Sequence, residues 1–93
     1  MKKMEENVLN YRIIIDTEKY DDGSAVYVAH VPSLGISDYG DTIEEVLLSI
    51  KDGIKLAVES LADEGEEVPI DHVDSQIIAT AQILTSRKLN LGL

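Results

Sequence analysis

The fold is decided by residues 22–45, which read DGSAVYVAHVPSLGISDYGDTIEE. The stretch opens on Asp22 and Gly23, which form a hairpin dipeptide because both residue types tolerate positive φ. The β-rich run 25–31 follows, and Pro32 ends it because proline cannot donate to a strand ladder. These signals predict a strand that pairs antiparallel with another strand lying before the turn.

The second half of this stretch predicts a short strand and the start of a long helix. Residues 36–39 suit a third strand, after which Gly40 allows a sharp change of direction. Thr42 and Glu45 match a capping box, with Thr42 at the N-cap and Glu45 at N3. An apolar stripe with the helical period follows, at positions 43, 46, 47, 50, 54, 57, 58 and 61. Gly65 occupies the place of a C′ glycine and ends the predicted helix.

Two further strands are predicted outside this stretch. Polar and apolar residues alternate over 8–17, which predicts the first strand of the hairpin. Residues 76–84 are almost wholly apolar and rich in β-branched side chains, which favours a last strand covered on both sides. The expected fold class is therefore α+β with the order β-β-β-α-β, one long helix packing on one face of an antiparallel sheet. Residues 1–93 are expected to form a single domain with its core over about 8–84, and the other sheet face is expected to stay partly apolar.

Composition limits what the chain can bind and where it works. The 8 basic and 18 acidic residues give a net charge of −10, whereas nucleic-acid binding normally needs a basic patch. Direct DNA binding is therefore not expected, and the charge suits a basic macromolecule as partner. The simpler interpretation of the charge is that it confers solubility. No apolar run approaches the roughly 20 residues of a membrane span. Residues 1–7 are polar and predicted to be frayed, and their two lysines are followed by acids and not by the apolar segment of a signal peptide. The sequence also contains no Cys, so no disulfide framework is possible. We therefore expect a cytoplasmic protein without a membrane anchor.

The sequence carries no strong catalytic motif, and neither a cofactor nor a metal is predicted. An alternative function remains a divalent-metal nuclease, because acids at strand ends can hold Mg²⁺ for phosphodiester cleavage. Its candidate residues are Asp16, Asp38 and Asp41. The two histidines, His30 and His72, are interpreted as ordinary surface residues. Binding is favoured over catalysis.

Two leucines indicate a second kind of function. Leu48 and Leu56 fall off the apolar stripe of the predicted helix, toward its polar face. Single exposed leucines are common, and a second contact surface such as a dimer interface is the sharper interpretation. An orphan self-associating domain with a regulatory role is therefore a further alternative, and a homo-oligomer is expected.

Taken in order, four motifs resemble the N-terminal domain of HicB-type antitoxins, over about residues 11–69. The motifs are Asp22-Gly23, Tyr27-Val28-Ala29, Val31-Pro32-Ser33-Leu34 and Gly40-Asp41-Thr42-Ile43-Glu44-Glu45. The resemblance implies a partial ribonuclease-H-like fold without nuclease activity. It also implies a domain that binds and neutralises a small basic RNA-cleaving toxin of the HicA type, and that oligomerises. For partner contact, loop acids and the tyrosine near the helix start are the candidate residues, namely Asp22, Asp38, Tyr39 and Asp41.

The chain departs from the family pattern in two places. Family members often carry Leu-Pro-Gly-Cys in the turn after the second strand, whereas this chain has Leu34-Gly35-Ile36. Many members continue into a DNA-binding domain that represses their own operon. The residues that follow Leu84 are too few for such a domain, so direct operator binding is not expected here.

Overall fold

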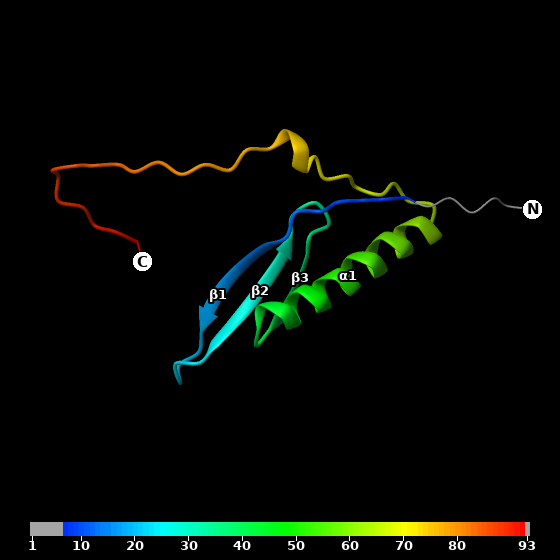
Figure 1. Ribbon diagram of the computed structural model, residues 1–93, viewed down its shortest axis with the longest axis horizontal. Coiled ribbons are helices and arrows are strands. Elements are labelled where there is room, and N and C mark those ends of the chain that lie inside the picture. Colours follow the sequence, from blue (N-terminus) through cyan, green and yellow to red (C-terminus); the bar gives the residue numbers. More distant parts are fainter. Residues whose placement is uncertain (1–6, 93) are drawn as a thin grey trace, which may run out of the picture.

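The computed structural model describes residues 7–92, so the predicted fraying of positions 1–6 lies outside the described residues. Three strands form one antiparallel sheet in the order β1-β2-β3, and a single long helix lies across it (Figure 1). The elements are β1 (Ile14–Lys19), β2 (Ala25–Val31), β3 (Ile36–Gly40), α1 (Ile43–Asp63) and the short 3₁₀ helix η1 (Val73–Ser75). The predicted α+β class with one helix on one sheet face is confirmed.

The hairpin between β1 and β2 forms where the Asp-Gly dipeptide predicts it. Gly23 takes a left-handed conformation with φ of 88°, and its N–H donates to the Tyr20 carbonyl at 3.0 Å. The Tyr20 N–H donates to the Ser24 carbonyl at 2.9 Å, which closes the turn. The resulting register places Glu18 opposite Val26 and Val28 opposite Tyr39. Those residues consequently share one face of the sheet.

The predicted start of the first strand is wrong. Pairing covers Ile14–Lys19 in place of residues 8–17, because β2 ends at Val31 and offers no partner to earlier residues. Residues 8–13 instead run beside the loop that follows α1. The Tyr11 hydroxyl donates to the Pro69 carbonyl at 2.6 Å, and the Arg12 N–H donates to Asp71 Oδ2 at 2.9 Å.

Both ends of α1 follow the capping signals of the sequence. The Glu45 N–H donates to Thr42 Oγ1 at 3.1 Å, as a capping box requires. At the other end Gly65 has φ of 70°, and the N–H groups of Gly65 and Glu66 donate to the carbonyls of Ala62 and Leu61. That pair of bonds is the Schellman motif, which satisfies carbonyls that the helix itself leaves free. Within the described residues, α1 included, no helix combines the length and apolar character needed to cross a membrane.

The core is small and lies between α1 and the strands β2 and β3. Its fully buried members are Ala29, Val31, Val46 and Ile50. Val26 is also buried, but it lies on the other face of the sheet, opposite Glu18. α1 packs against β2 and β3, and no packing of α1 on β1 occurs within the described part of the chain. The helix thus covers one face of two strands, while β1 stands at an uncovered edge.

The last predicted strand does not join the sheet. Residues 76–84, called the arm from here on, run extended but pair with none of β1, β2 or β3. Figure 1 shows the arm in orange, leading away from the sheet after η1. The radius of gyration is 18.4 Å, compared with about 12 Å for a compact chain of this length. An apolar run specifies extended backbone, but a strand also needs an edge to pair with, and in this chain the arm points away from both edges.

Candidate protein-binding surface

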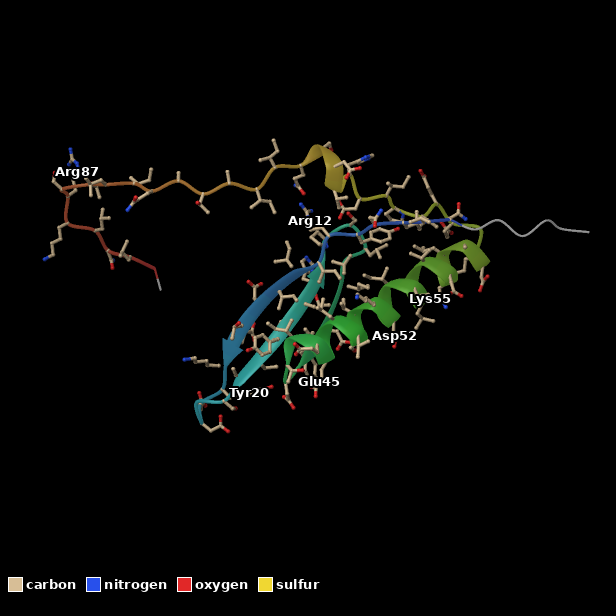
Figure 2. All side chains as sticks on the ribbon, in the orientation of Figure 1. Arg12, Tyr20, Glu45, Asp52, Lys55 and Arg87 are labelled. Atoms are coloured by element: carbon tan, nitrogen blue, oxygen red, sulfur yellow. The ribbon has the colours of Figure 1, made fainter. Side chains whose placement is uncertain are left out.

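The hairpin turn and the junction between β3 and α1 lie at the same end of the sheet. Lys19 pairs with Ala25 at the turn, and Tyr27 pairs with Gly40 just before the helix begins. Figure 2 shows Tyr20 in the turn and Glu45 in the first helical turn at this end of the molecule. Segments far apart in the sequence are thereby brought together, as the sequence-based site requires.

A shallow hollow of about 230 Å³ opens on the sheet face that α1 leaves uncovered. It is lined by Glu18, Tyr20, Val26, Val28 and Tyr39. The side chains of Tyr20 and Tyr39 are 55% and 70% exposed, so both rings stand at the rim and remain accessible to a partner. Exposed tyrosines over an apolar floor are the kind of anchor that protein interfaces use.

One acid, Glu18, lines this hollow, and two others lie in the turn and at the helix start at the same end of the sheet. Asp22 is exposed in the turn, and its Oδ1 accepts hydrogen bonds from the Ser24 hydroxyl at 2.6 Å and the Ser24 N–H at 2.9 Å. The Ser24 hydroxyl, and then the Ser24 N–H, lower the pKa of Asp22 below its ordinary value. Asp41 is exposed at the helix start, where its N–H donates to Glu45 Oε2 at 3.2 Å. We call Glu18, Tyr20, Asp22, Tyr39 and Asp41 the acidic tyrosine surface.

Asp38 lies away from that surface, although it is the neighbour of Tyr39 in sequence. Its carboxylate accepts a hydrogen bond from the Ser49 hydroxyl of α1 and another from the Tyr39 N–H at 2.8 Å. The Ser49 hydroxyl, followed by the Tyr39 N–H, holds the pKa of Asp38 below its ordinary value. Asp38 therefore joins β3 to the helix, and three of the four predicted contact residues gather at one end of the sheet without it.

The three acids of the nuclease alternative are not brought together. Asp16 pairs with Val28, which pairs with Tyr39, so Asp16 lies on the open face with Tyr39. Asp38 faces α1 on the opposite side of the sheet. Over residues 7–92 no group of three His, Asp or Glu side chains is arranged to hold a metal ion. His30 instead places Nδ1 3.1 Å from Ser37 Oγ on the open face.

The two leucines off the helical stripe are exposed as the sequence indicates. Leu48 and Leu56 are 69% and 70% exposed on α1. They lie eight residues apart, which is close to two helical turns, and so share a side of the helix. They form a candidate contact stripe that is separate from the acidic tyrosine surface.

A second and more apolar hollow was not expected from the sequence. It measures about 540 Å³ and is lined by Asn7, Leu9, Val58, Glu59, Ala62, Val68 and Ile70. It forms because the segment that precedes β1 lies against the last turns of α1 and the following loop. A strand was predicted for that segment, so no pattern in the sequence located the hollow.

The sequence indicates Tyr39 as a candidate contact residue, but it singles out neither Tyr20 nor the floor of the first hollow. Tyr20 lies just before the predicted hairpin dipeptide, and Val26 lies within the predicted strand 25–31. Their proximity follows from the register, which sets Glu18 opposite Val26 and Val28 opposite Tyr39. Alternation along the predicted third strand does separate two of the candidate residues. Asp38 and Tyr39 are adjacent, so their side chains must point to opposite faces of the sheet.

Two curated proteins are similar to this chain. A UPF0150 protein of Thermoplasma acidophilum is 37% identical over 67 residues, which cover 71% of this chain and 91% of that protein. An uncharacterised 14.9 kDa protein from the rep-hol intergenic region of Haemophilus phage HP1 is 36% identical over 61 residues. That match covers 66% of this chain and 44% of the phage protein, so the chain spans less than half of its length. No protein-family model and no solved structure matches the chain.

Proposed function

The chain belongs to the UPF0150 family, and on that premise we propose that it is a HicB-like antitoxin domain, which binds and neutralises a small basic RNA-cleaving toxin. The proposal is a binding function and not a catalytic one. The observation that carries it is the acidic tyrosine surface, where exposed Tyr20 and Tyr39 flank an apolar hollow among carboxylates. The resemblance of the motifs between Asp22 and Glu45 to HicB-type domains supports the same interpretation.

The chemistry of this surface suits a cationic protein. A net charge of −10 steers a basic partner toward the chain, and the carboxylates of the surface fix its orientation. The tyrosine rings supply contact area with little loss of side-chain entropy, because each has only two rotatable χ angles. Occlusion of the RNA-binding groove of a ribonuclease would then inhibit it without any covalent step.

The test uses a HicA-type toxin, a small basic ribonuclease. RNA cleavage is measured as the chain is added, and the dissociation constant is measured at low and high salt. Stoichiometric inhibition that weakens with salt is expected, because charge attraction is screened. The chain alone, with Mg²⁺ or Mn²⁺, is expected to leave RNA intact.

Two sets of variants locate the contact. Tyr39→Ala combined with Asp22→Asn and Asp41→Asn is expected to weaken binding at least about 100-fold, as loss of an aromatic anchor and two charges would. Asp52→Asn with Asp63→Asn removes the same two charges from the exposed side of α1 and serves as the matched control. Equal affinity of both sets for the toxin would refute this surface, and absence of any binding would refute the antitoxin function.

A further inference from the structure

The arm exposes a cluster of large aliphatic side chains to solvent, which is unfavourable for a monomer. Its exposed members are Ile77, Ile78, Ile83 and Leu84, with exposed fractions between 78% and 97%. In an extended strand alternate residues share a face, which gives one side that is apolar throughout. That side consists of Ile77, Ala79, Ala81 and Ile83. Such a strip fits a sheet edge, where the backbone is paired and one face is covered.

The matching edge belongs to β1. In the described part of the chain β1 pairs only with β2, so the N–H and C=O groups along its other side have no ladder partner. Ile13 and Ile15 pack against the core from the helix side but stay only half-buried, because α1 lies over β2 and β3. A strand added beside β1 would extend this incompletely covered face. Unpaired edges of this kind are templates for strand addition.

Charge fixes the direction in which the arm pairs. If Ile77 lies beside Ile13 in a parallel pairing, the apolar side of the arm continues the face that holds Ile13 and Ile15. Residues after Leu84 then reach the hairpin turn. Arg87 and Lys88 then come to the acids Asp21 and Asp22. The antiparallel alternative would place the same two cations near Arg12, where like charges repel. The parallel arrangement is therefore the favourable one.

The arm of one chain is directed away from its own β1. Asp71, which accepts from the Arg12 N–H, holds the root of the arm beside the start of β1. The turn of η1 follows, in which the Ser75 N–H and hydroxyl both donate to the His72 carbonyl, at 3.2 and 3.0 Å. After this turn the arm diverges from β1, and Arg87 lies at its far end, remote from the sheet (Figure 2). Nine residues of strand span about 30 Å, enough to reach along a neighbouring molecule.

We propose that the arm pairs in parallel with the β1 edge of a second copy of this chain, and that the two copies exchange arms reciprocally. A two-fold exchange uses the same surface twice and leaves neither arm exposed. It also adds apolar contact to a core that has only four fully buried side chains among residues 7–92, which is small for a chain of this length. The exchange is measured on the chain alone, without a toxin, so its failure is distinguishable from a failure of the proposed antitoxin function.

The first test is the mass of the chain in solution, by light scattering or sedimentation over a range of concentrations. The wild-type chain is expected at twice its 10.2 kDa mass. Ile77→Lys with Ile83→Lys is expected to raise the dimer dissociation constant about 100-fold or more, because two buried aliphatic side chains are lost. Leu48→Lys with Leu56→Lys makes the same chemical change on α1 and is the matched control, expected to leave the dimer intact.

A second test identifies the pairing directly and does not depend on tolerance of lysine. The chain contains no cysteine, so introduced thiols are unique. Thr17→Cys on β1 is combined in one chain with Ala79→Cys, Thr80→Cys or Ala81→Cys on the arm, which samples both faces and three registers. Under mild oxidation the exchange predicts a covalent dimer, and mixing the single-cysteine chains predicts a cross-linked heterodimer.

Three outcomes would overturn the proposal. The first is a monomer at high concentration. The second is a dimer that the arm variant leaves intact and the Leu48 and Leu56 variant abolishes. The third is a disulfide formed within one chain, which would show that the arm folds back on its own β1.

Discussion

Two apolar runs of this chain, β2 and the arm, have similar compositions and opposite environments. β2 holds three of the five buried apolar side chains of residues 7–92 and pairs with a strand on each side. The arm has a similar preference for extended backbone, yet its large side chains are exposed to solvent and no strand of the sheet pairs with it. Extended conformation is thus a local property, whereas membership in a sheet depends on which edge lies within reach. The described chain therefore divides into two parts. The body, residues 7–75, folds through local signals, whereas the arm is proposed to pair with a second copy of the chain.

The largest expected effect separates the body from the arm. Ile50→Ala removes a side chain that is 1% exposed, and we expect the free energy of unfolding to fall by about 2–5 kcal/mol through lost burial and a residual cavity. Ile77→Ala makes a comparable truncation in the arm and is expected to change it by less than about 0.5 kcal/mol at concentrations where the chain is monomeric. Urea denaturation measures both. Similar losses at the two positions would mean that the arm packs on the body of its own chain.

The next effect tests how closely the body is packed where the sheet meets the helix. A Cβ at Gly40 would lie 3.0 Å from the Val46 backbone nitrogen and 3.2 Å from Val46 Cβ. Gly40→Ala is therefore expected to destabilise the protein by about 1–3 kcal/mol, since the start of α1 has to shift. The midpoint of thermal unfolding reports the change. A neutral result would show that this junction relaxes easily and that the position of the helix on β3 is not tightly set.

A glycine in the middle of α1 is expected to respond in the opposite direction. A Cβ at Gly53 would meet Ile36 Cδ1 at 3.7 Å, which is ordinary van der Waals contact. Gly53→Ala should then stabilise the protein by about 1 kcal/mol, because alanine loses less backbone freedom in a helix. Close packing, one reason for a mid-helix glycine, is thus not required here. If both Gly40→Ala and Gly53→Ala destabilise the chain, the separation between α1 and the sheet is smaller than described.

The difference between body and arm also explains which features the sequence could predict. Thr42, Glu45 and Gly65 act through neighbours within a few residues, and the helix they delimit was predicted with the correct caps. The first strand was placed too early because its extent depends on where β2 stops. The arm was assigned to the sheet because an apolar run carries no information about its partner.

In the candidate site, too, the sequence predicts what depends on neighbouring residues but not what depends on contacts between separate segments. Asp22, Tyr39 and Asp41 come together because the turns on either side of the sheet meet at one end. Tyr20 joins them only through the register, which is a property of two strands and not of one segment. Asp38 lies on the other face of the sheet from Tyr39, as strand alternation alone indicates for neighbouring residues.

The smallest expected effect lies at the boundary between body and arm, where Asp71 accepts from the Arg12 N–H. That hydrogen bond, foremost among several favourable contacts, lowers the pKa of Asp71 below its ordinary value of 3.8. A lowered folded-state pKa means that the unfolded chain binds more protons in that range. The stabilisation is therefore fully present above the ordinary value and is lost as the pH falls through the folded-state pKa.

Asp71→Asn removes the charge while keeping an oxygen that can accept a hydrogen bond. The difference in unfolding free energy between wild type and variant is expected to be largest near neutral pH. It should shrink as the pH falls below 3.8, the ordinary pKa of the Asp carboxyl. Asp52→Asn, on the exposed side of α1, controls for the loss of one charge. Denaturation at several pH values measures the difference, and a proton titration followed by NMR reads the Asp71 pKa directly. A difference that stays constant with pH would mean that the bond to Arg12 does not hold in solution. The body would then end at Pro69, whose carbonyl accepts from the Tyr11 hydroxyl, and the freely directed segment would include the residues between Pro69 and η1.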